Sequence, residues 1–101
     1  MTIKFLNNDG TAEFFLEGRL DSTNANEAET LLLNTVVEKN FTDVILDLGE
    51  LEYVSSAGLR IFMKMYMRLR KKGGTISIRN TPEGIMDVFE MTGFVSLFKF
   101  I

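Results

Sequence analysis

Two adjacent serines, Ser55 and Ser56, are the residues of this chain whose types and position best suit chemistry. They lie between a short apolar run, residues 43–48, that is typical of a strand and a helical pattern over residues 59–72. Serine is a favoured N-cap because its hydroxyl can accept a hydrogen bond from an N–H of the first helical turn. One serine can therefore cap the helix while the other stays free. A free hydroxyl there lies in a positive field that suits a phosphate, either bound or covalently attached.

The composition narrows the chemistry that such a site could perform. The chain of 101 residues contains no cysteine and no histidine. It therefore cannot form disulfides, Ser-His-Asp or Cys-His catalytic sets, or zinc sites with thiolate or imidazole ligands. The hydrophobic content of 46% is that of a soluble globular protein, and no apolar run approaches the ~20 residues of a membrane span. We expect one cytoplasmic domain over residues 1–101, without signal peptide, membrane insertion, catalytic residues, metal or cofactor.

The elements that precede the serines follow from periodicity and turn residues. Two predicted strands, residues 2–6 and 11–16, flank Asn7-Asn8-Asp9-Gly10, a turn sequence that indicates an antiparallel hairpin. The spacing of apolar residues then predicts a helix that ends at Asn40. Its candidate N-caps are Asp21, Ser22 and Thr23. Asp21 is thus open to a structural as well as a functional interpretation.

The segments after the serines complete the fold. Gly73-Gly74 predicts the end of the second helix, and residues 75–79 and 95–101 are predicted strands. Between them, Thr81-Pro82 predicts a short helix with the threonine as N-cap and the proline in the first turn. The order ββαβαβαβ predicts an α/β fold, a mixed β-sheet of about five strands with an N-terminal hairpin and helices packed on one face.

The helix after the serines is strongly basic. Six of the eleven Lys and Arg residues lie between Arg60 and Lys72, although the net charge is −3. A solvated helix face explains this pattern better than a nucleic-acid site, because no aromatic residues are interleaved on the basic side. A helical wheel places Ile61 and Met65 on the flank of the basic stripe. We therefore expect both to be exposed beside the serines, where they suit a protein partner.

The motif Ser55-Ser56-Ala57-Gly58-Leu59-Arg60 resembles the STAS domain, in its stand-alone form as a bacterial anti-sigma factor antagonist (anti-anti-sigma factor). Other segments share the resemblance: Glu17–Asp21, Val44–Leu48, Gly73-Gly74 and Phe89–Phe94. The similarity covers nearly the whole chain and implies the STAS fold.

The resemblance implies transcription regulation by partner switching. In the family, the serine that matches Ser56 is phosphorylated by a serine kinase that is also the anti-sigma factor. The unphosphorylated antagonist binds this kinase and frees the sigma factor, and a serine phosphatase resets the cycle. Ser55, which stands where relatives often have aspartate, is a minor candidate for phosphorylation. The resemblance implies a partner surface of Asp21, Ser22, Ser55, Ser56, Ala57, Gly58, Arg60, Ile61 and Lys64, with Gly58 keeping the turn open.

Several alternatives stay open. Related STAS domains are non-enzymatic subunits of lipid-transport ATPase complexes, in which Ser56 would be a helix cap only. STAS domains of anion transporters and of multidomain stress complexes are disfavoured, because we expect no membrane segment and no N-terminal sensor domain. A hydrolase that uses Asp21 and Asp47 has little support, since the sequence fixes no second group beside Asp47. We expect a monomer or a weak dimer, and no nucleic-acid partner.

Overall fold

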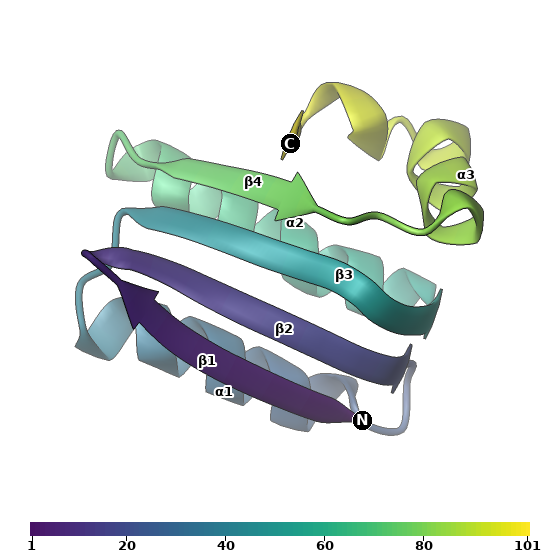
Figure 1. Ribbon diagram of the computed structural model, residues 1–101, viewed down its shortest axis with the longest axis horizontal. Coiled ribbons are helices and arrows are strands. Elements are labelled where there is room, and N and C mark those ends of the chain that lie inside the picture. The colour runs from purple at the N-terminus through teal and green to yellow at the C-terminus, as the bar shows by residue number, and fades with distance from the viewer.

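The computed structural model describes residues 1–101 as a five-stranded mixed sheet with three α-helices (Figure 1). The elements are β1 (Thr2–Asn8), β2 (Thr11–Leu20), α1 (Ala25–Glu38), β3 (Asp43–Val54), α2 (Ser56–Lys71), β4 (Thr75–Arg79), α3 (Glu83–Thr92), the 3₁₀ helix η1 (Phe94–Ser96) and β5 (Lys99–Phe100). The strands lie in the order β1-β2-β3-β4-β5, with β1 antiparallel to β2 and every other pair parallel. The predicted mixed sheet with its N-terminal hairpin is confirmed.

The helices lie on one side of the sheet, as predicted. Figure 1 shows α1 and α2 behind the strands and α3 beyond the end of β4. The rings of Phe62 on α2 and Phe89 on α3 are 6.2 Å apart between centroids, so α3 packs against the same helical layer. Alternate side chains of β2 and β3 point into one core of 24 buried residues. None of the helices is long and apolar enough to cross a membrane.

The two central strands are longer than the sequence pattern predicts. β2 continues to Leu20 and β3 to Val54, and the two last residues pair with each other. The register between these strands shifts twice, and Gly18 has a φ of +99°. Each shift breaks the alternation of apolar and polar residues, which is the only sequence signal for a strand of this kind.

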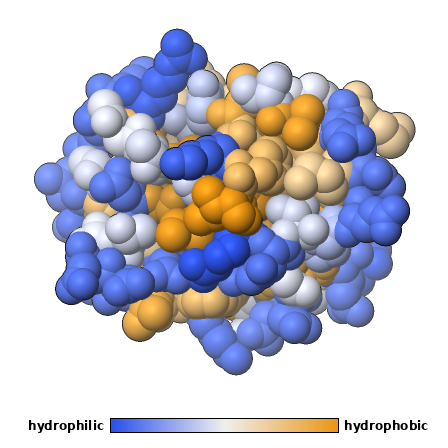
Figure 2. All heavy atoms as spheres, turned by 45° about the horizontal axis from the view of Figure 1, so that its top comes forward, coloured by the Kyte–Doolittle hydropathy of each residue, from blue (hydrophilic) through white to orange (hydrophobic).

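The C-terminal segment differs most from the predictions. The strand predicted over residues 95–101 is wrong, because η1 intervenes and β5 contains only Lys99–Phe100. Phe98 is buried and Phe100 is half-buried, and both rings pack against Phe89 of α3. Apolar side chains such as Ile101 stay exposed, and Figure 2 shows hydrophobic surface on this side of the molecule next to hydrophilic residues. At α3, Pro82 is the N-cap rather than a first-turn residue, and no side chain caps the helix.

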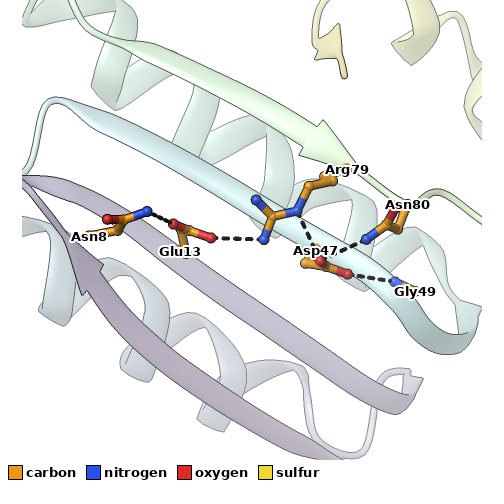
Figure 3. Close-up of polar contacts among 6 residues, drawn as sticks. All are labelled: Asn8, Glu13, Asp47, Gly49, Arg79 and Asn80. Atoms are coloured by element: carbon orange, nitrogen blue, oxygen red, sulfur yellow. Dashed lines mark hydrogen bonds and ion pairs between the residues drawn. The ribbon is translucent and has the colours of Figure 1, made fainter.

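An ion network crosses the face of the sheet that carries no helices (Figure 3). Arg79 of β4 donates from Nη2 to Glu13 of β2 at 2.8 Å and from Nε to Asp47 of β3 at 3.0 Å. Both carboxylates accept further hydrogen bonds. Asn8 Nδ2 donates to Glu13 at 2.7 Å, and the Gly49 amide and Asn80 Nδ2 each donate to Asp47 at 3.0 Å. Glu13 is only 5% exposed, and a buried charge is costly without hydrogen-bond donors close to it. Arg79 and Asn8 supply these donors. The groups beside Asp47, which the sequence alone does not reveal, are thus hydrogen-bond donors that hold its carboxylate in a structural network.

This network favours the ionised carboxylates. The hydrogen bond from Arg79, followed by that from Asn8, lowers the pKa of Glu13. Burial by itself raises the pKa of Asp47, but the hydrogen bonds from Gly49, Arg79 and Asn80 outweigh it and lower that pKa. A carboxylate with a lowered pKa stabilises the fold above its unfolded-state pKa and loses that contribution as the pH falls through the folded-state value.

The substitution Arg79→Met removes the shared cation and leaves Glu13 buried without it. We expect the free energy of unfolding at pH 7 to fall by about 1–3 kcal/mol. The difference from wild type should shrink between about pH 5 and pH 3, because the wild type loses its ionised carboxylates there. Urea unfolding at several pH values measures both effects. The exposed Arg70 offers a matched control, since Arg70→Met should change stability by less than about 0.5 kcal/mol; a loss at Arg79 that is the same at every pH would contradict the network.

Candidate partner-binding site

Two loops lie side by side because they follow neighbouring parallel strands. Leu20 and Val54 are the last residues of β2 and β3 and pair with each other. Directly beyond them, the Ser55 amide donates to the Leu20 carbonyl oxygen at 2.9 Å. The loop that begins at Asp21 therefore lies next to the serine turn, as the predicted partner surface requires. The carboxyl ends of parallel strands are a frequent position for binding sites.

The two serines have different roles. Ser55 is the N-cap of α2, and its hydroxyl oxygen accepts a hydrogen bond from the Gly58 amide at 3.4 Å. Ser56 is the first residue of the helix, is exposed, and its hydroxyl forms no hydrogen bond. The prediction that one serine caps the helix while the other stays free is confirmed.

The Asp21 side chain organises its own loop. Its Oδ1 accepts hydrogen bonds from the Thr23 hydroxyl at 2.6 Å and the Thr23 amide at 3.0 Å. These two bonds, the hydroxyl first, lower the pKa of Asp21 and keep it ionised. Asp21, Ser22 and Thr23 do not cap α1, whose N-cap is Asn24. The structural interpretation of Asp21 as a helix cap is therefore wrong, and its carboxylate lies at the surface loop instead.

Asn24 fixes the conformation of this loop, a role that the sequence pattern did not predict. Its Oδ1 accepts from the Asp21 amide at 3.0 Å, while its Nδ2 donates to the Arg19 carbonyl at 2.8 Å. The side chain makes no capping bond to α1, although it occupies the N-cap position. An asparagine directly before the helical pattern was the available signal, since asparagine is a preferred N-cap.

Gly58 is required for packing inside the protein and not for contact with a partner. It is buried, and a Cβ at this position would lie 2.8 Å from Leu20 Cγ and 2.8 Å from Val54 Cγ2. Real side chains do not approach so closely, so only glycine lets the first turn of α2 pack against the ends of β2 and β3. The prediction that Gly58 keeps the turn open to a partner is wrong.

Ile61 and Met65 are also core residues and not part of the surface. They are 2% and 1% exposed, so the predicted exposure of both is wrong. The cause is α1, which contacts the flank of α2 and widens its buried arc beyond the face that meets the sheet. Lys64 marks the edge of this contact, because its Nζ lies 2.8 Å from Glu29 Oε1 on α1.

The remaining predicted residues lie in the Asp21 loop and in the first turns of α2. Ser22, Ser56, Arg60 and Lys64 are exposed, whereas Asp21, Ser55 and Ala57 are half-buried. No carboxylate cluster in the structure is arranged to hold a metal ion. Asp47 pairs with Phe15 in the middle of the strands, roughly 20 Å from the Asp21 loop at 3.3 Å per residue, so these two carboxylates cannot act together.

Comparisons with known proteins identify the family. The model of a family described as STAS domain matches residues 2–101. BtrV of Bordetella bronchiseptica, which is named as an anti-sigma factor antagonist, is 38% identical over 90 residues, covering 89% of this chain and 77% of BtrV. The chain belongs to the STAS domain family.

Solved structures share the fold at low identity. A protein from Thermotoga maritima named as an anti-sigma factor antagonist has a TM-score of 0.92 at 16% identity, covering 97% of this chain and 84% of that one. Unphosphorylated SpoIIAA, an anti-sigma factor antagonist, has a TM-score of 0.79 at 15% identity, with coverage of 99% and 87%. The phosphorylated form of Bacillus SpoIIAA gives 0.77 at 16% identity, covering 99% and 91%. A sulfate transporter family protein from Wolinella succinogenes gives 0.72 at 15% identity, covering 86% and 70%, so the fold alone does not assign a function.

The substitution Gly58→Ala tests the packing that joins the two loops. The added methyl group must displace Leu20 or Val54, so we expect a loss of about 1–3 kcal/mol in the free energy of unfolding. The amide NMR signals of Asp21 and Thr23 should shift, because Leu20 directly precedes this loop. Gly84 on α3 is the matched control, since a Cβ there meets nothing within 4 Å and Gly84→Ala should be neutral or stabilising. Equal stability of the two variants would contradict the close contact.

Proposed function

We propose that this protein is an anti-sigma factor antagonist that works by partner switching. The unphosphorylated form binds an anti-sigma factor that is also a serine kinase, and thereby frees a sigma factor. Phosphorylation at Ser56 switches this binding off, and a serine phosphatase restores it. The observation that carries the proposal is the exposed, unbonded hydroxyl of Ser56 at the start of α2. The identity with BtrV over most of the chain supports it.

The protein acts in this scheme by binding rather than by catalysis, as a STAS domain in the cytoplasm. The kinase supplies the chemistry: the γ-phosphoryl group of ATP moves to Ser56 Oγ, the bond to the bridging oxygen breaks, ADP leaves, and a base of the kinase takes the hydroxyl proton. Ser56 suits this step better than Ser55 does. The Ser55 hydroxyl is half-buried and already accepts a hydrogen bond from the Gly58 amide.

Phosphorylation at Ser56 changes the surface and leaves the fold intact. The phosphate adds about −1.5 to −2 charge at neutral pH. At a helix N-terminus this charge is favourable by roughly 0.3–1 kcal/mol, so the domain stays folded. The same charge repels acidic groups of a partner and must be desolvated on docking. A loss of ~3 kcal/mol in binding free energy corresponds to more than a hundredfold in affinity.

Affinity capture with three baits tests this function. We expect the wild type and Ser56→Ala to capture an ATP-binding serine kinase, and Ser56→Glu to lose it, with all three proteins folded by circular dichroism. The captured kinase should phosphorylate the wild type and Ser55→Ala at residue 56, as mass spectrometry can locate. Ser96→Glu is a matched control, because Ser96 is an exposed serine on η1. Capture of a transport ATPase by all three baits would instead favour the lipid-transport alternative.

A further inference from the structure

Arg60 is a free cation close to Ser56. It is exposed, and its guanidinium forms no hydrogen bond or ion pair in the structure. Lys64, the next basic residue along α2, is engaged, because its Nζ pairs with Glu29 Oε1 on α1 at 2.8 Å. Arg68, Arg70, Lys71 and Lys72 lie eight or more residues further along the chain. Arg19, which precedes the Asp21 loop, stacks on the ring of Tyr53 at 4.3 Å.

The geometry of α2 places Arg60 over the serine. Ser56 and Arg60 are four residues apart on the helix, which puts their Cβ atoms about 5–6 Å from each other. Side chains on a helix lean towards its N-terminus, so the long arginine side chain extends over the turn that begins at Ser56. No Asp or Glu occurs in α2, and none therefore competes from the same helix for the guanidinium.

We propose that Arg60 works in both states of the switch, an inference that rests on the proposed function. With Ser56 unmodified, the free guanidinium contacts a carboxylate of the anti-sigma factor. With Ser56 phosphorylated, the guanidinium pairs with the phosphate of its own helix, a geometry for which arginine is well suited. Phosphorylation then adds a negative charge to the docking surface and also withdraws a positive one from it. The second effect strengthens the first.

A phosphate titration tests the ion pair without any partner. Phosphoserine is incorporated at position 56 by genetic encoding, in the wild-type background and with Arg60→Gln, Arg60→Lys or Arg70→Gln. The second pKa of the phosphate is followed by ³¹P NMR. A nearby cation favours the dianion, so we expect this pKa to be lower in the wild-type background than with Arg60→Gln by about 0.3 unit or more. Arg60→Lys should retain part of the shift, and Arg70→Gln should retain all of it. Equal pKa values in the wild-type and Arg60→Gln backgrounds would overturn the ion pair.

Affinity for the captured kinase tests the withdrawal of the cation. We expect Arg60→Gln to weaken binding of the unphosphorylated protein about tenfold, as for a charged contact worth roughly 1.4 kcal/mol. Phosphorylation should then reduce affinity by a smaller factor with Arg60→Gln than with the wild type, because the cation is already gone. The same factor in both backgrounds would overturn the dual role of Arg60. Phosphorylation without effect in either background would overturn the proposed function and leave the ion pair to stand on the titration.

Discussion

The close packing between the first turn of α2 and the ends of β2 and β3 is the constraint on which the site depends. Gly58 allows Leu20 and Val54 to fill the space that a side chain would take. The backbone hydrogen bond from the Ser55 amide to the Leu20 carbonyl oxygen also joins the ends of β2 and β3 at this point. Two loops that are more than thirty residues apart in sequence thereby lie side by side at one edge of the sheet.

The ion network on the helix-free face secures β2 and β3, the strands that carry the site, together with β4. Arg79 joins β2 and β3 from β4, so the three parallel strands are held in register by charge as well as by the backbone ladder. A buried carboxylate such as Glu13 is costly without a partner, which makes any shifted register unfavourable. The network lies about mid-strand and takes no part in the loops. It stabilises their scaffold while leaving their chemistry independent.

The sequence predicts well whatever depends on local pattern. Turn residues, helical periodicity and the order of elements give the mixed sheet, and the small residues between strand and helix give the capped serine turn. Long-range contacts are beyond such patterns. A helical wheel cannot show that α1 covers Ile61 and Met65, and an isolated glycine does not reveal whether a partner or a neighbouring strand needs the space at Gly58. The pairing of Glu13, Asp47 and Arg79 needs the register of three strands, which no local signal contains.

The surroundings of Ser56 would let the proposed phosphorylation act on binding without acting on the fold. The Ser56 hydroxyl makes no internal hydrogen bond, so a phosphate there would break nothing that the folded state needs. The cap is supplied by Ser55 and the loop geometry by Asn24, two residues that the phosphate does not replace. In the proposed switch, both states of the serine would therefore have nearly equal stability. The phosphate would then change the free energy of binding rather than the free energy of folding. Its effect would be largest at the partner interface, where desolvated charges interact most strongly.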